Sequence, residues 1–263
     1  MYAKDVLADA QWLERHRHDP WVRLVEVDAR SHTPGAIALS RRELQEPIRR
    51  DVLGPDAFGE LLGSRGISDE HTIVLCGHGA AYAYWCLHYY GHVDSKLLHG
   101  PGAPVRSPAP GSETFHARSP DHSIRALRYE VMAAVENGTR LIDARSPREH
   151  AAGHVPGAAS IPWGRAMRAD GRFRGAAELE AIYPDDGEPV IAYCRSGERS
   201  AHTWFVLHEL LGRGEVKNYD GGWTEWGNLV GVPVCASTST PTRPISRPTW
   251  HQSPAVPLPR PWN

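Results

Sequence analysis

Residues 140–162 read RLIDARSPREHAAGHVPGAASIP, and residues 23–40 read RLVEVDARSHTPGAIALS. Both stretches begin with a short apolar run, continue through Asp-Ala-Arg-Ser and then reach Pro-Gly-Ala. Similarity of this kind between distant parts of one chain indicates an internal duplication. The apolar runs are typical of strands that are buried on both faces of a sheet. We therefore expect two copies of one structural unit.

The repeat extends beyond these two stretches. The run TIVLC at 72–76 matches PVIAYC at 189–194, and in both copies a glycine-containing turn follows the cysteine. Aromatic-rich helical stretches come next, at about 80–91 and 200–212. Strands that alternate with helical stretches at short spacing predict a parallel sheet flanked by helices. The expected fold is therefore α/β, with tandem duplicated domains that each contain such a sheet.

The segments between and after the two copies have a different composition. Residues 100–122 hold five prolines and three glycines, and residues 241–263 hold seven prolines. Such sequences break helices and strands and bury little apolar surface. The predicted division is an N-terminal domain at 1–105, a linker at 106–121, a C-terminal catalytic domain at 122–235 and a disordered tail at 236–263.

The overall composition excludes several classes of protein. The 263 residues carry a formal net charge of −2, and 41% of them are hydrophobic. This charge gives no electrostatic support to a nucleic-acid or membrane-surface partner, and no apolar run is long enough to span a bilayer. The four cysteines form no CxxC pair and the histidines have no metal-binding spacing, so no metal is expected. A recognisable signal peptide is missing, which favours a reducing cytoplasm.

The candidate catalytic residue is Cys194, in the segment YCRSGERS at 193–200. It lies between a predicted buried strand and a predicted helix, where open α/β sheets bind their ligands. The N-terminus of a helix offers unpaired N–H groups and a positive dipole end, which stabilise anions and thiolates. Gly197 allows the loop to curl so that several N–H groups point at the sulfur. The pattern predicts a thiolate nucleophile in an anion-binding cradle.

The predicted cradle runs from Arg195 to Arg199. We expect these two arginines to bind the charge of the substrate and Ser196 to donate a hydrogen bond. Glu198 is expected to cap or orient one of the arginines, and it would discourage dianions if it faced the pocket.

Three further residues follow the strand of the second copy. Asp143 and Arg145 form either a structural turn with an ion pair or part of the pocket wall. Arg148 is a weaker candidate for binding an anion.

These motifs together resemble those of the two-domain rhodaneses, the thiosulfate and 3-mercaptopyruvate sulfurtransferases. The run 194–199 is similar to their six-residue active-site loop, and GHVPGA at 153–158 is similar to a motif that follows a strand. YDGGWTEWGN at 219–228 resembles their C-terminal signature. The resemblance covers about 20–235, and bacterial thiosulfate-type members are the most similar.

The resemblance implies a sulfurtransferase that needs no cofactor. It implies transfer of sulfane sulfur from a small-molecule donor, through a persulfide on Cys194, to cyanide, a thiol or a sulfur-carrier protein. The donor stays open between thiosulfate and 3-mercaptopyruvate. Ser196 stands where thiosulfate-type loops often carry Lys, and Arg195 stands where mercaptopyruvate-type loops often carry Gly. An arginine followed by Gly-Glu-Arg is found in bacterial thiosulfate-type members and favours thiosulfate.

The first copy is expected to be shortened and non-catalytic. Cys76 matches Cys194, but its loop CGHGAAY contains no arginine. From Cys76 to Gly91 the count is 15 residues, whereas from Cys194 to Gly212 it is 18. We expect the three missing residues to come from the loop or from the first turn of the helix. The resemblance also implies an inactive first domain.

Two other interpretations remain. Phosphatases that use a cysteine–arginine cradle have five residues between these two, whereas four lie between Cys194 and Arg199, which disfavours a phosphatase. The alternative within the family is a sulfur-relay or docking protein that delivers persulfide sulfur to a partner in a biosynthetic pathway, with little small-molecule turnover. The shortened first copy and the proline-rich tail favour that alternative.

Overall fold

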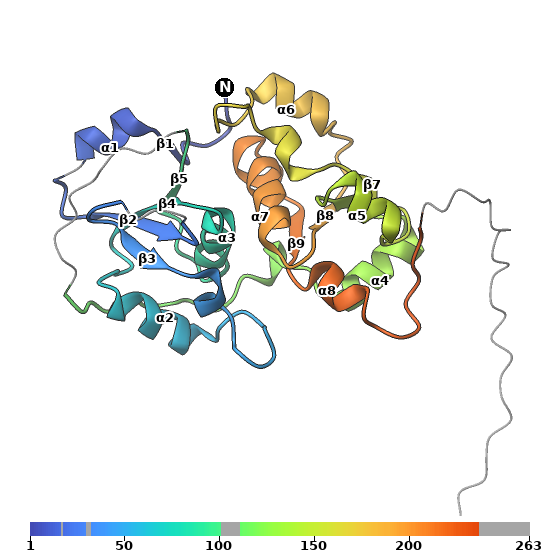
Figure 1. Ribbon diagram of the computed structural model, residues 1–263, viewed down its shortest axis with the longest axis horizontal. Coiled ribbons are helices and arrows are strands. Elements are labelled where there is room, and N and C mark those ends of the chain that lie inside the picture. The colour runs from blue at the N-terminus through green and yellow to red at the C-terminus, as the bar shows by residue number, and fades with distance from the viewer. Residues whose placement is uncertain (17, 30–32, 101–110, 237–263) are drawn as a thin grey trace, which may run out of the picture.

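The computed structural model describes residues 1–16, 18–29, 33–100 and 111–236. The predicted tail at 236–263 lies outside the described residues except for its first position, as do residues 106–110 of the predicted linker. Figure 1 shows two α/β lobes side by side, an N-terminal lobe built on the first sheet and a C-terminal lobe built on the second. No helix in the described ranges is long and apolar enough to cross a membrane.

The N-terminal lobe contains a sheet of five parallel strands in the order β1-β5-β4-β2-β3. All six residues of the interior strand β2 are buried, and four of them are apolar, as is typical of a strand covered on both faces. The strands are β1 (Leu7–Ala8), β2 (Val22–Val27), β3 (Ile37–Leu39), β4 (Thr72–Cys76) and β5 (Ser95–Leu98). The helices are α1 (Ala10–His16), the 3-10 turn η1 (Arg41–Leu44), α2 (Pro55–Ser64) and α3 (Ala80–Tyr89).

The C-terminal lobe contains four parallel strands in the order β7-β6-β8-β9. They are β6 (Arg140–Asp143), β7 (Ala159–Ser160), β8 (Val190–Tyr193) and β9 (Val216–Tyr219). The helices and turns are η2 (His122–Ile124), α4 (Arg128–Asn137), α5 (Pro147–Ala152), η3 (Trp163–Ala166), α6 (Ala176–Ile182), α7 (Glu198–Trp204), the π-helical η4 (Phe205–Leu210) and α8 (Gly222–Trp226).

The two sheets share one topology. When β2, β3, β4 and β5 are matched in chain order to β6, β7, β8 and β9, the spatial order of the strands is identical. The position of β1 in the second sheet is reduced to a single parallel bridge between Arg125 and Asn218. The predicted duplicated α/β fold with parallel sheets and flanking helices is therefore confirmed.

The expected location of the three missing residues is wrong. In each lobe the helix begins four residues after the cysteine, α3 at Ala80 after Cys76 and α7 at Glu198 after Cys194. The difference lies at the other end, because α7 continues without a break into η4 and reaches Leu210, whereas α3 ends at Tyr89. A π-helical segment accommodates extra residues within a helix. The two loops therefore have equal lengths, and the helix after Cys76 is the shorter element.

The two lobes share a hydrophobic core, which includes residues of α3, α7 and η4. Tyr84 of α3 meets Phe205 edge to face, with 4.8 Å between the ring centroids. The imidazole of His88 lies 5.9 Å from the Trp204 ring. In Figure 1, α7 accordingly lies on the side of the C-terminal lobe that faces α3. Aromatic pairs of this kind add to the stabilisation from apolar burial, so the lobes pack as one body.

The described part of the predicted linker is packed against the N-terminal lobe. Residues 111–120 contain no helix or strand, yet the Phe115 side chain is buried and contacts Phe58 of α2. The N–H of Glu113 donates to the carbonyl of Gly63 at 2.9 Å. The expectation that this segment buries little apolar surface is therefore wrong at Phe115, because glycines on α2 allow the chain to approach the helix closely.

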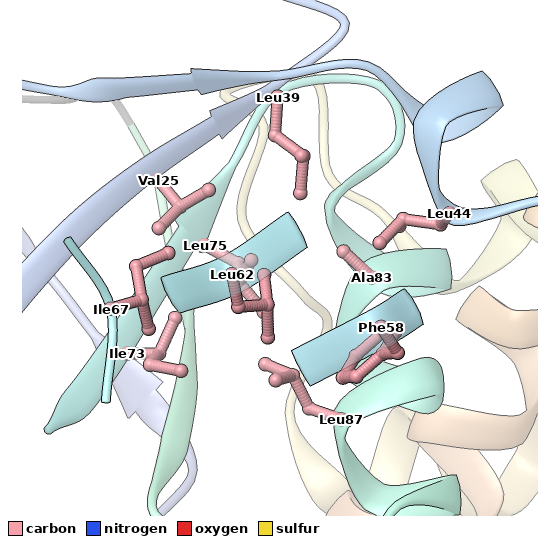
Figure 2. A pocket seen from close by; sticks show the side chains of 10 residues that line it. All are labelled: Val25, Leu39, Leu44, Phe58, Leu62, Ile67, Ile73, Leu75, Ala83 and Leu87. Carbon is pink, nitrogen blue, oxygen red and sulfur yellow. The ribbon is translucent and has the colours of Figure 1, made fainter. Parts of the chain in front are cut away.

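A small gap lies in the core of the N-terminal lobe, between the sheet and helices α2 and α3 (Figure 2). Its volume is about 10 Å³ and its lining side chains are all apolar, including Leu62, Ile73 and Leu87. A space of this size without polar partners does not hold even one water molecule stably. The gap is therefore a packing feature and not a ligand site.

Candidate active site

Cys194 follows β8 directly and is 1% exposed. The chain then makes a three-residue turn and enters α7 at Glu198. Gly197 occupies the left-handed region with φ of 89°, where a side chain is strained. A Cβ atom at this position would also lie 3.0 Å from the Tyr82 ring and 3.1 Å from Asp220. The glycine thus allows both the sharp turn and the close contact with the N-terminal lobe.

Hydrogen bonds from helix α8 hold the loop that contains Cys194. The N–H groups of Trp223 and Thr224 donate to the carbonyls of Cys194 and Arg195, at 2.8 and 2.9 Å. Gly222 makes this approach possible, because its φ is 53° and a Cβ would lie 2.7 Å from the Cys194 carbonyl oxygen. In a trans peptide the C=O and the next N–H point in opposite directions. The N–H groups of residues 195 and 196 therefore point away from α8.

The same reasoning applies at the start of α7. The carbonyl of Gly197 accepts hydrogen bonds from the N–H of Ala201 at 2.9 Å and from the Asn218 amide at 3.4 Å. Its peptide plane is thereby fixed, and the N–H of Glu198 belongs to the unpaired first turn of the helix. Within the described ranges, no N–H of residues 195–199 donates to a backbone carbonyl. These groups are available to an anion, as the cradle prediction requires.

Ser200 is a site residue that the sequence reasoning missed. Its buried hydroxyl lies 3.4 Å from Cys194 Sγ, as a donor, and 3.2 Å from the Gly197 carbonyl. A hydroxyl in this position stabilises a thiolate. The residue stands at the end of the segment that contains Cys194, and its place one helical turn after Gly197 could have shown that it returns to the cysteine.

The two arginines of the loop lie in different surroundings. Arg199 forms two hydrogen bonds of 2.8 Å with the carboxylate of Glu149 on α5. This pairing lowers the pKa of Glu149 to about 2. The Glu149 hydrogen bond and, more weakly, the neighbouring Cys194 raise the pKa of Arg199. Arg195 is exposed, and Ser196 is partly buried.

Glu198 pairs with a residue of the other lobe. Its carboxylate accepts the Nε–H of Arg41 from η1. The expected partners Arg195 and Arg199 are therefore wrong, because Arg199 is already held by Glu149 and the side chain of Glu198 extends toward the N-terminal lobe.

Asp143 and Arg145 do not line an open pocket. Asp143 and Arg145 are 0% and 2% exposed, and Arg145 binds the carboxylate through Nε and Nη2. The Arg145 guanidinium also lies 4.5 Å from the Trp223 ring. These contacts agree with the structural ion pair and not with a pocket wall, because both groups are enclosed by protein. Arg148 is exposed on α5.

A second ion pair, between Arg125 and Asp220, lies next to the loop. Arg125 donates to both carboxylate oxygens of Asp220, at 2.9 and 3.0 Å, and also to Asp51 of the N-terminal lobe. The backbone of Asp220 in turn lies against Gly197. Sequence reasoning did not find this group, since 74 residues separate Arg125 from Asp51 and 95 separate it from Asp220.

The fold and the site define a class: tandem α/β proteins with a cysteine loop between a strand and a helix of the C-terminal lobe. Among comparisons with known proteins, the family described as Rhodanese-like domain matches residues 128–229. A Haloferax volcanii relative, provisionally named a thiosulfate sulfurtransferase, is 44% identical over 89% of this chain and 97% of its own. The sulfur carrier protein TtuD of Thermus thermophilus is 39% identical over 88% and 96%.

A solved structure agrees with these relatives. SseA from Escherichia coli, described as a 3-mercaptopyruvate sulfotransferase, superposes with a TM-score of 0.70 over 82% of this chain and 98% of its own, at 22% identity. At that identity the likeness concerns the fold. Taken together with the closer relatives, it shows that the chain belongs to the two-domain rhodanese family and is a sulfurtransferase.

Proposed function

We propose that the protein transfers a sulfane sulfur from thiosulfate through a persulfide on Cys194. The Cys194 thiolate attacks the outer sulfur of thiosulfate, a new S–S bond forms, and the bond between the two thiosulfate sulfurs breaks. Its electron pair leaves with sulfite, and the charge passes to the terminal sulfur of the persulfide. The observation that carries this proposal is the set of N–H groups of residues 195, 196 and 198, whose peptide carbonyls are held on the opposite side by α8 and by Ala201. Such donors stabilise charge without reorganising.

The charged side chains complete the proposed site. Arg195 is the exposed cation at the loop and binds the incoming anion. Arg199 is held in place by its two hydrogen bonds to Glu149 and adds a second cation to the loop. Ser196, half-buried in the same turn, donates to the substrate. We assign the reaction to the C-terminal domain at 122–235 and a supporting role to the N-terminal domain at 1–105.

The acceptor is a thiophile such as cyanide, a thiol or a carrier protein. A persulfide is consumed when a nucleophile attacks its terminal sulfur and the cysteine leaves as the thiolate, which restores the enzyme. This cycle requires a free thiol, which supports a reducing cytoplasmic setting.

A second candidate function is sulfur relay to a protein partner. It is favoured by the likeness to the Thermus thermophilus protein that is named a sulfur carrier. In this case the same persulfide forms, but a partner protein and not a small molecule takes the sulfur.

The test uses intact mass and cyanolysis on the full chain. After incubation with thiosulfate or 3-mercaptopyruvate, we expect the protein to gain the mass of one sulfur atom and to yield thiocyanate when cyanide is added. Cys194→Ser abolishes both signals, and the matched control Cys76→Ser keeps both. Persulfide with negligible thiocyanate turnover supports the relay function. A wild-type protein that gains no sulfur from either donor contradicts the proposal.

A further inference from the structure

One charged residue of the N-terminal lobe reaches into the Cys194 loop. Arg41 lies on the 3-10 turn η1, and its side chain is only 16% exposed. Besides the ion pair with Glu198, its Nη1 donates to Gln45 Oε1 at 3.0 Å. The guanidinium also lies 5.8 Å from the centre of the Tyr82 ring. Arg41 is therefore held in one place before any substrate arrives.

The partner of Arg41 is the one acidic residue of the loop. Glu198 is the first residue of α7 and stands between Gly197 and Arg199. Its carboxylate is partly exposed, with 36% of the side chain accessible. A carboxylate in this place repels a thiolate, a persulfide anion and a dianionic donor, unless a cation neutralises it.

The balance of charge around the loop depends on Arg41. The loop itself holds Arg195, Glu198 and Arg199, and Glu149 neutralises Arg199. With Arg41 included, this group of five side chains carries one net positive charge. Without Arg41 the group is neutral, and the cost of an anion at the site rises.

We propose that Arg41 is a specificity-determining positioning residue of the sulfur-transfer reaction. It neutralises Glu198 across the boundary between the lobes, so that the loop accepts the doubly charged thiosulfate. This role rests on the proposed function and adds a contribution from the N-terminal lobe to it. Because Coulomb energy scales with the charge of the ligand, the loss of Arg41 weakens the binding of a dianion more than that of a monoanion.

The test compares Arg41→Gln with Arg42→Gln, which changes the exposed arginine next to it on the same turn. Steady-state cyanolysis is measured with thiosulfate and with a singly charged organic thiosulfonate as donors. For Arg41→Gln we expect KM for thiosulfate to rise on the order of tenfold, with kcat within about twofold and a smaller rise for the thiosulfonate. Arg42→Gln leaves both values unchanged.

A second pair of variants makes the test independent of any local damage at position 41. Glu198→Gln lowers KM for thiosulfate several-fold, because Arg41 then acts unopposed. The double variant Arg41→Gln/Glu198→Gln returns KM to within about twofold of the wild type. Thermal melts of all variants verify that the fold is retained.

The outcomes separate the two proposals. If the wild type gains a sulfur but Arg41→Gln has the same KM as Arg42→Gln, or the double variant is worse than Arg41→Gln, the assignment of Arg41 is wrong and the proposed function stands. If the wild type gains no sulfur from any donor, both proposals fail.

Discussion

The loops after Cys76 and Cys194 have the same length and the same place in the topology, but different surroundings. Each follows the matching strand of its sheet and reaches a glycine, Gly79 or Gly197, one residue before the helix. The next three positions are Ala-Ala-Tyr in the N-terminal lobe and Glu-Arg-Ser in the C-terminal lobe. The first lobe therefore keeps the loop length and the order of strand, loop and helix, without the charged and hydroxyl side chains.

The backbone groups also differ between the two loops. The N–H of Gly79 donates to the carbonyl of Val27, so part of the first loop is bound to its own sheet. Cys76 donates its S–H to the Val25 carbonyl at 3.8 Å, and burial, followed by Glu26, raises the pKa of its thiol to about 12. A strand, a loop and a helix in the right order are thus not enough to make a cysteine reactive. A reactive cysteine also requires that N–H groups of the loop stay unpaired.

Among changes that keep Cys194, the largest effect is expected from one that disturbs the contact between α8 and the loop. Gly222→Ala places a Cβ against the carbonyls of Cys194 and Arg195, so the peptide planes of the loop must turn. We expect kcat/KM in cyanolysis to fall on the order of a hundredfold. Gly138→Ala is the matched control, since Gly138 has a φ of 82° and open space at its Cβ. Equal activity of the two variants would show that α8 does not shape the site.

A smaller effect is expected from Ser200, which occupies the position of Tyr82 in the other lobe. Ser200→Ala removes the hydroxyl that lies 3.4 Å from Cys194 Sγ. A hydrogen bond to a charged group contributes enough for about a tenfold fall in kcat/KM. Ser64→Ala, which removes an exposed serine hydroxyl from α2, serves as control. Unchanged kinetics in Ser200→Ala would exclude a role for this hydroxyl in stabilising the thiolate.

The smallest effect concerns acid stability and His202, two residues after Ser200 on α7, which matches Tyr84 of α3. Burial lowers the pKa of His202 to about 4, below its ordinary value of 6.5. The unfolded chain therefore takes up a proton below pH 6.5 that the folded protein refuses until about pH 4. Stability is full above pH 6.5 and falls between these values by at most about 1.4 kcal/mol per pH unit for this group.

Urea unfolding at pH 7.5, 6 and 5 measures this loss. His202→Gln is expected to reduce the pH dependence of the unfolding free energy, whereas His78→Gln, which changes an exposed histidine, leaves it unchanged. Part of the dependence remains in His202→Gln, because burial also lowers the pKa of His88 to about 4. Identical slopes for the wild type and His202→Gln would contradict the prediction.

Much of the fold was predictable because the signal repeats. The apolar runs at 23–27 and 140–143 mark matching strands, and the cysteine-ended runs mark the next pair. The location of the site followed from Cys194 at a strand end. The prediction placed the three extra residues of the C-terminal lobe in the wrong part of the chain. Counting residues from each cysteine to the glycine after the helix gives the difference in length but not its location.

The partners of the loop residues were beyond sequence reasoning. Glu198 pairs with Arg41, which is 157 positions away in the sequence, and Arg199 pairs with Glu149, which is 50 positions away. Such pairs depend on how lobes and helices pack, whereas local patterns report only neighbours along the chain. Ser200 is different, because its return to Cys194 follows from helical geometry alone and was available from the motif.

The aromatic contact between α3 and η4 has an evolutionary consequence. Once a duplicated gene retains one active loop, the other is released from selection for chemistry, but Tyr84 must still fit against Phe205. Sequence changes in the N-terminal copy are then accepted when they preserve the shape and the apolar character of the contact. The Ala-Ala-Tyr sequence in place of Glu-Arg-Ser is the kind of change that such a filter allows, since it exchanges charge for buried surface. The N-terminal copy then persists as the surface against which α7 and η4 pack.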